Sequence, residues 1–114
     1  MAIAASLVVL AAAASSPDLG CSGPDNWAAT SAYAQLKNAG MLTPDAVDFA
    51  KTRVELFAQQ KIGKDLYRQV HRVAFTTKAG PIIRVITLSN ASSEECSMSS
   101  VRLELVTQVL GAYP

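Results

Sequence analysis

The sequence predicts a small α+β domain in which one N-terminal helix packs on a four-stranded antiparallel meander. Two observations carry this prediction. Residues 66–110 contain three segments rich in β-branched residues and separated by turn or loop residues, and a segment near residue 54 offers a fourth. Ahead of them, small apolar residues recur at helical spacing between residues 24 and 40. A run of strands after a single helix is typical of the α+β class.

Three strands are expected in the second half of the chain, at 66–77, 81–89 and 101–110. In the last, the residues on one face are Val101, Leu103, Leu105, Thr107 and Val109, whereas Arg102, Glu104 and Gln108 fall on the other face. Such alternation is the pattern of a half-buried strand. Residues 78–80 form a short loop whose Gly80 can adopt a positive φ. The first two strands should therefore form an antiparallel hairpin.

The strand at 66–77 mixes polar and apolar residues on both faces. One face carries Tyr67, Gln69, His71, Val73 and Phe75. The other carries Leu66, Arg68, Val70, Arg72 and Ala74. We expect Val73 and Phe75 to be buried and the row of Arg68 and Arg72 to face solvent.

A helix of about 15 residues is expected after residue 22. Pro24 and Asp25 suit the first turn, where a missing N–H costs nothing and a negative charge meets the positive end of the helix dipole. Gly40 can end the helix. Its apolar stripe is formed by Ala29, Ala32, Tyr33 and Leu36. Trp27 at one end of this helix and Tyr33 are expected to pack in the core, and a ligand-binding role for them is the weaker alternative.

Residues 42–62 permit two interpretations. Pro44 could begin a second helix that ends at Gly63, because Val47, Ala50, Val54 and Phe57 would form an apolar stripe. Alternatively, residues 53–59 alternate as a strand, with a loop at 61–65 leading into the next. The alternation favours a short helical turn at 44–50 followed by a strand.

The first sixteen residues predict a secretory signal peptide, which leaves 17–114 as one small domain. Residues 1–14 are uncharged and almost entirely Ala, Val, Leu and Ile, and small residues at the end of the run suit cleavage. This run is shorter than the roughly 20 residues that a membrane span requires. No Lys or Arg precedes it, so a true start codon upstream, or a buried N-terminal helix, stays open.

Cys21 and Cys96 are the two cysteines, and an even count in an exported chain predicts one disulfide. It would close a loop of about 75 residues and stabilise the fold by roughly 4 to 5 kcal/mol in the chain-entropy estimate. A lipid-anchored Cys21 is a weaker alternative, because Asp18 stands where such motifs carry Leu. A two-cysteine metal site would require further ligands nearby, and a redox pair would show Cys-x-x-Cys spacing.

Charge and composition limit the partners that we expect. The chain of 114 residues has 17% charged residues and a net charge of +1. Neither nucleic acid nor an anionic membrane is therefore an expected partner. No membrane span should remain after signal removal.

Two stretches, 61–70 and 94–99, resemble small exported bacterial proteins of unknown function. That resemblance implies no activity and transfers no functional residue. The order of elements, one helix and then a four-stranded meander, is similar to cystatin-like folds. These folds include inhibitors, binding modules and some enzymes, so the likeness selects none of these functions.

No catalytic motif and no metal-ligand spacing occurs in the sequence, so we expect neither enzyme activity nor a cofactor. The candidate binding residues are Tyr67, Arg68, His71 and Arg72, and Arg84 could join the two arginines in a cationic patch. We expect a periplasmic or secreted binding module, of inhibitor or immunity type, whose partner is another envelope or secreted protein. The alternative is a ligand-binding protein or small enzyme with a helix–sheet pocket, with His71 and Tyr67 at its mouth.

Overall fold

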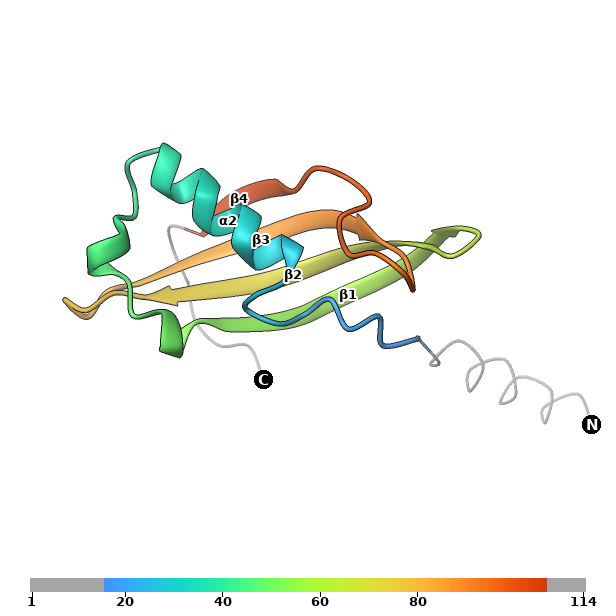
Figure 1. Ribbon diagram of the computed structural model, residues 1–114, viewed down its shortest axis with the longest axis horizontal. Helices are drawn as coiled ribbons and strands as arrows, with labels where there is room; N and C mark the ends of the chain where they lie inside the picture. The colour runs from blue at the N-terminus through green and yellow to red at the C-terminus, as the bar shows by residue number, and fades with distance from the viewer. Residues whose placement is uncertain (1–15, 107–114) are drawn as a thin grey trace, which may run out of the picture.

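Residues 16–106 form a four-stranded antiparallel sheet with one α-helix lying across one of its faces (Figure 1). These residues are the part of the chain that the computed structural model describes. The strands are β1 (Arg53–Gly63), β2 (Leu66–Thr76), β3 (Ile82–Ala91) and β4 (Arg102–Val106), and they are adjacent in chain order. The predicted fold class and meander are confirmed. The expected signal peptide, and the end of the expected last strand, lie outside the described residues.

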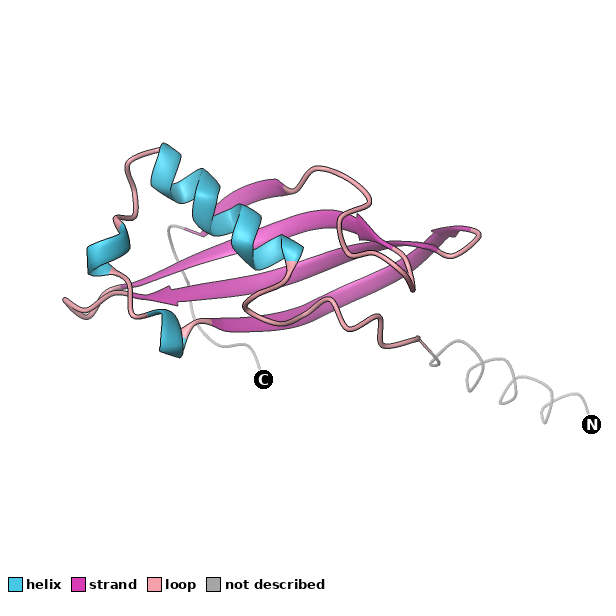
Figure 2. Cartoon of the chain, in the orientation of Figure 1, coloured by secondary structure: helices cyan, strands magenta, loops and turns pink. Residues whose placement is uncertain are grey.

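The helix α2 (Trp27–Asn38) is shorter than predicted and begins later. Pro24 and Asp25 precede it, because Asn26 keeps an extended backbone and occupies the N-cap position. The helix ends as expected at Gly40, whose φ of +75° is accessible to a residue without Cβ. Figure 2 shows the helix and the long loop before β4 on the same side of the sheet.

The segment from 44 to 63 follows the strand interpretation, and the second-helix alternative is wrong. Two short 3₁₀ turns, η1 (Pro44–Ala46) and η2 (Phe49–Lys51), lead into β1. The strand continues four residues beyond the predicted alternation, so the expected loop shortens to a tight turn in which Asp65 has a φ of +49°. Pairing with β2 along its whole length explains why this segment is extended.

Strand alternation divides the sheet into two chemically different faces. We call the side under α2 the covered face. Its buried residues on the two central strands are Gln69, His71, Val73, Phe75, Val85, Thr87, Ser89 and Ala91, and at its ends Tyr67 and Ile83 are half-buried. Val73, Phe75 and Val85 form the core with Ala29, Ala32 and Leu36 of α2. The small helix residues let the helix backbone lie close to the sheet.

The disulfide between Cys21 and Cys96 is present, as the cysteine count predicted. It joins the segment before α2 to the loop before β4, so both are held over the covered face. The Trp27 indole N–H donates to the Ser99 carbonyl at 2.8 Å and fixes the helix to the same loop. Trp27 was expected in the core, but its side chain is 37% exposed, because its ring lies against the loop and not over the sheet.

Candidate functional site: the arginine face of the sheet

The face of the sheet opposite α2 carries every arginine of the chain. These are Arg53 on β1, Arg68 and Arg72 on β2, Arg84 on β3 and Arg102 on β4. The register explains this, because Arg53 and Arg84 both pair with Ala74, and Arg102 pairs with Leu88. Paired residues in an antiparallel sheet point to the same side. We call this side the arginine face.

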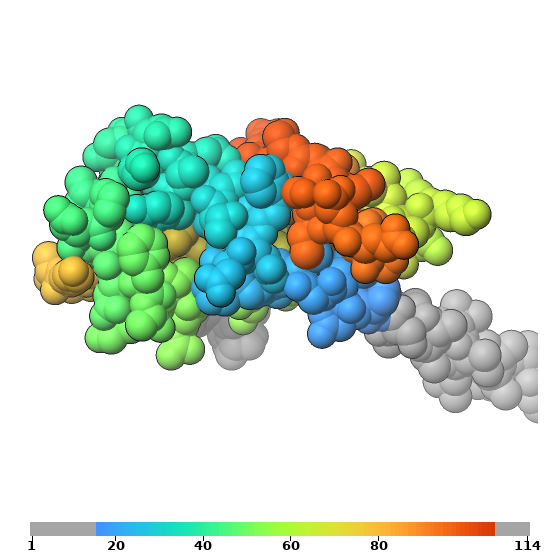
Figure 3. Space-filling view, viewed as in Figure 1, coloured from blue at the N-terminus to red at the C-terminus, as the bar shows by residue number. Residues whose placement is uncertain are grey.

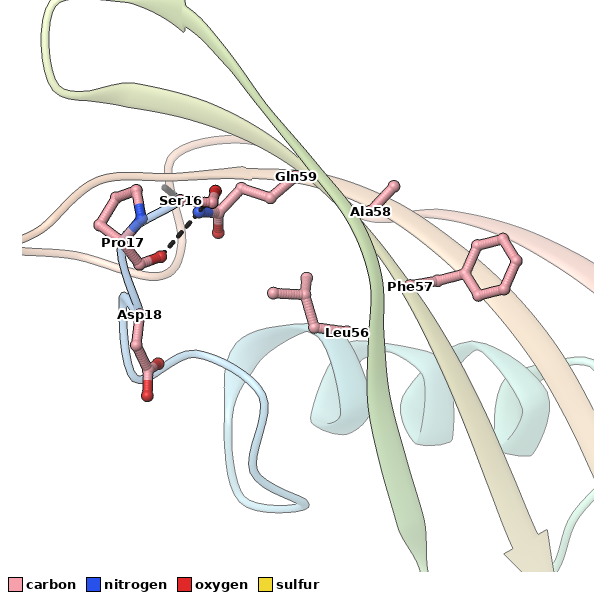
Figure 4. Close-up of a pocket in the computed structure, with 7 residues that line it drawn as sticks. All are labelled: Ser16, Pro17, Asp18, Leu56, Phe57, Ala58 and Gln59. Atoms are coloured by element: carbon pink, nitrogen blue, oxygen red, sulfur yellow. Dashed lines mark hydrogen bonds between the residues drawn. The ribbon is translucent and has the colours of Figure 1, made fainter. Parts of the chain in front are cut away.

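A β-bulge in β1 brings an aromatic ring to the arginine face. Leu56 pairs with His71 and Ala58 pairs with Val70, so Phe57 is an extra residue in β1. The bulge interrupts the alternation that the sequence suggested. Figure 4 shows the side chains of Phe57 and Ala58 on the side of the strand away from the chain segment around Pro17. Phe57 is 61% exposed there.

Arg72 is held by two contacts on this face, one with an aromatic ring and one with a carboxylate. Its guanidinium lies 5.1 Å from the centre of the Phe57 ring, within cation–π range. Its Nε also lies 3.7 Å from a carboxylate oxygen of Glu55. Arg102 is paired with Glu104 at 3.1 Å. Within residues 16–106, Arg53, Arg68 and Arg84 have no carboxylate within ion-pair distance.

Apolar side chains lie among these arginines. On the central strands, Val70, Ile86 and Leu88 lie between Arg68 and Arg84, and Ile82 lies beyond Arg84 at the start of β3. Ile82 is 42% exposed, and the other three are half-buried. Val106 of β4, opposite Arg84, extends the row. The face therefore combines an apolar centre with flexible, charged side chains.

Charge is separated between this face and the rest of the protein. The arginine face has five arginines and two glutamates, which gives a net charge of +3. All five lysines and the other seven acidic residues lie elsewhere, with a net charge of −2. The overall charge of +1 hides this asymmetry, so the composition argument against anionic partners does not apply to this face.

The structure divides the predicted binding residues between the two faces. Arg68 and Arg72 lie on the arginine face, whereas Tyr67 and His71 lie on the covered face. His71 is completely buried, and its Nε2 is hydrogen-bonded to the Ser22 hydroxyl at 3.0 Å. Burial lowers the pKa of His71 below its ordinary value of 6.5, so the ring is neutral at pH 7.

Nδ1 of His71 has no hydrogen-bond partner among residues 16–106. Catalysis by a serine–histidine pair needs a third group that orients the imidazole, together with access for the substrate. The Ser22–His71 pair shows neither in the described part of the chain, and we read it as a structural contact between the N-terminal segment and the sheet.

Sequence reasoning missed Arg53, Phe57 and Arg102 as members of one surface. The alternation within each strand places Arg68 and Arg72 together, but it cannot align one strand with the next. The sequence does contain one signal for this surface. Every arginine falls inside an expected strand, whereas every lysine falls near a turn or in the helix. This separation of arginine from lysine indicates a special sheet surface even though the net charge is small.

The edge of β1 beside the bulge is partly occupied by the chain itself. Gln59 Nε2 donates to the Ser16 hydroxyl at 2.9 Å and to the Pro17 carbonyl at 2.8 Å. These contacts and the bulge protect an edge strand against pairing with other chains. They also border a shallow hollow, which is lined by residues 16–18 and by residues 56–59 of β1 (Figure 4).

The described residues contain neither a metal-ligand cluster nor a helix suited to a membrane span. Between residues 16 and 106, no group of three or more His, Cys, Asp or Glu side chains could hold a metal ion. No helix in this range is long and apolar enough to cross a membrane. Comparison with protein-family models, with curated proteins and with solved structures finds no match for this chain.

Proposed function

We propose that this protein is an exported, non-catalytic binding module that binds a protein partner on its arginine face. The observation that carries the proposal is the placement of all five arginines, and of no lysine, around an apolar centre on one sheet face. An inhibitor or an immunity-type protein would act in this way, by covering a surface of its partner.

The residue types favour a protein surface over a simple polyanion. Arginine and aromatic residues are enriched at protein interfaces, whereas lysine is depleted there. Arginine is preferred because its guanidinium is weakly hydrated and binds carboxylates in a bidentate manner. A polyanion would use the charges but leave Ile82, Phe57 and the half-buried centre without a partner. A protein with apolar and acidic residues matches both parts of the face.

The net charge of +3 on this face indicates an acidic partner surface. Arg68 and Arg84 lie on the two central strands, flank the apolar residues and have no ion-pair partner within residues 16–106. Charge complementarity of this kind mainly raises the association rate and fixes the orientation of the complex. Binding should therefore weaken as salt increases.

Export is supported by two independent features. The disulfide suits an oxidising compartment, because cytosolic thiols are kept reduced. The uncharged apolar run at residues 1–14 suits a signal peptide. Together they favour a partner in the periplasm or outside the cell.

The test uses a photo-crosslinking amino acid at two matched positions. Ile82 lies on the arginine face and is 42% exposed, and Met41, after the helix, is 46% exposed. In the producing host, we expect a protein adduct from position 82 and none from position 41. Combining position 82 with Arg68→Glu and Arg84→Glu should reduce the adduct at least tenfold. The control carries Lys37→Glu and Lys78→Glu, which change the charge equally away from this face.

Two results would overturn the proposal. One is an adduct formed equally from both positions, which would indicate nonspecific contact. The other is an adduct at position 82 that survives the arginine reversals but is lost with the lysine reversals. If the expected adduct forms at position 82, mass spectrometry identifies the partner, and the sequence of the partner shows whether the crosslinked surface is acidic.

A further inference from the structure

A cavity of about 270 Å³ lies between α2, the η2 turn and the sheet. It is on the covered face, so it is separate from the arginine face and goes beyond the proposed function. In Figure 3, yellow atoms of the sheet are visible in a hollow between the cyan helix and the green segment around residue 50. The sequence suggested a helix–sheet pocket near Tyr67 and His71, but neither residue lines this cavity.

Three aromatic rings from three elements form the walls. Tyr33 of α2 meets Phe49 of η2 edge-to-face, with ring centres 5.0 Å apart and an angle of 70° between the planes. Tyr33 also lies 6.3 Å from the ring of Phe75 on β2, at an angle of 51°. Rings in several orientations can contact both the face and the edge of a flat guest.

One residue that lines the cavity has a buried polar group without a partner. Thr52 lines it, and the Thr52 hydroxyl is buried and makes no hydrogen bond with any residue from 16 to 106. Buried hydroxyls normally have a partner, because an unsatisfied one is costly. A guest that supplies an N–H or O–H group would satisfy this hydroxyl once the Thr52 side chain turns toward the cavity, because the oxygen has almost no accessible surface in this structure.

The charges at the cavity exclude acidic guests. Asp25 is the one ionisable carboxylate at its rim, and no Lys, Arg or His lines it. A carboxylate or phosphate would meet repulsion and no counter-ion. The volume is at the lower limit for small-molecule sites, which suits one or two fused rings.

We propose that this cavity binds a small, flat, uncharged aromatic molecule that carries one hydrogen-bond donor, such as an indole or a phenol. The three rings hold the body of the molecule, and the Thr52 hydroxyl accepts its N–H or O–H. Specificity comes from the hydroxyl, because the aromatic walls accept any flat ring.

The experiment compares two probes of the same shape on the disulfide-bonded protein. Indole has an N–H, and indene has a CH₂ group in its place. Amide chemical shifts would be followed while each probe is added up to millimolar concentration. We expect both probes to shift the amides of residues 29–33, 49–52 and 75, and indole to bind more tightly than indene.

Thr52→Val removes the hydroxyl and keeps the shape. It should weaken indole binding about fivefold, the loss expected for one neutral hydrogen bond, and leave indene unchanged. Phe49→Ala removes an exposed wall and should weaken both probes. Thermal unfolding shows that each variant is folded. Thr52→Val should not lower the melting temperature, because its hydroxyl makes no hydrogen bond in the described structure.

The proposal is overturned by any of three results. These are no shifts with either probe, shifts that do not map to the cavity, or an equal effect of Thr52→Val on indole and indene. Equal effects would mean that the valine changes the shape of the cavity and that the hydroxyl has no part in recognition.

Discussion

The two faces of this sheet come from the same strands but differ in composition, burial and charge. On β2, Phe75 of the covered face is 2% exposed, whereas Arg72 of the opposite face is exposed. On β3, Val85 is buried and its neighbour Arg84 is exposed. The covered face provides the apolar burial that stabilises the fold. Residues of the arginine face contribute less to folding, so they can be adapted to a partner.

The difference shows how a domain of this size can both fold stably and present a surface for binding. A chain of 114 residues has one modest core, and the helix covers one side of the sheet. The disulfide adds stability that this core lacks. The other side can then carry half-buried apolar residues and arginines. Substitutions that act on one face only can test this separation.

The largest expected effect is loss of the disulfide, which acts on the covered face. Replacing Cys21 and Cys96 together by Ala should lower the free energy of unfolding by about 4 kcal/mol, because the bridge closes a long loop. Urea denaturation of the double variant and the wild type measures this difference. Equal stability of the two proteins would contradict the assigned role of the bridge.

The second prediction compares two phenylalanines on opposite faces. Phe75→Ala should cost about 3 to 4 kcal/mol, in the lower part of the usual range because a cavity already lies beside that ring. Phe57→Ala should cost less than about 1 kcal/mol, because its ring is mostly exposed. Thermal or urea unfolding provides both values.

The comparison of these two variants also tests whether the arginine face is open. If Phe57→Ala destabilised the isolated protein as much as Phe75→Ala, the face would already be covered within the chain. The proposed docking site would then be wrong.

Two strands could be predicted from the sequence because alternation is visible within each segment. The disulfide could be predicted because the chain has two cysteines. Alternation within the predicted strands 66–77 and 81–89 identifies two faces, and the two cysteines allow a single pairing. The segment at 53–63 was ambiguous because its apolar residues fit both a period of 2 and a period of 3.6. Pairing with β2 resolved it, and this pairing is not encoded locally.

The arginine face could be predicted only in part, for the same reason. The alternation within one strand places Arg68 and Arg72 on the same face. Arg53 and Arg102 belong to that face only because of the register between neighbouring strands. Phe57 reaches this face only because β1 contains a bulge. The candidate binding residues combined His71 with Arg68 and Arg72, although the alternation of residues 66–77 already placed His71 on the opposite face.

The third prediction is that the buried His71 of the covered face makes the free energy of unfolding of the protein depend on pH. Because the pKa of His71 is lowered in the folded state, the unfolded chain takes up a proton first as the pH falls. The free energy of unfolding should fall as the pH drops below about 6.5, by at most about 1.4 kcal/mol per pH unit. The decline should stop below the lowered pKa.

The control for this prediction is His71→Leu, which has no titrating group at this position. Urea unfolding at pH 7.5 and pH 5 should show a smaller difference in the variant than in the wild type. The same pH dependence in both proteins would show that other groups cause it.

The smallest expected effect lies at the tip of the β1–β2 hairpin. The carboxylate of Asp65 accepts hydrogen bonds from the Ser93 backbone N–H at 3.0 Å and from the Ser93 hydroxyl at 2.7 Å, and joins the hairpin to the long loop. These bonds hold the pKa of Asp65 below its ordinary value of 3.8. The contact should therefore persist above pH 3.8 and be lost as the pH falls through the lowered pKa.

Removing this carboxylate should loosen the loop and leave both faces of the sheet unchanged. Asp65→Gly keeps the positive φ and should speed hydrogen exchange of the Ser93 amide, with no change at Val73 or Val85. Asp65→Asn retains an acceptor for that amide and should show a smaller increase. Faster exchange at Val73 in either variant would mean that the tip and the core open together, and that the loop is not an independent unit.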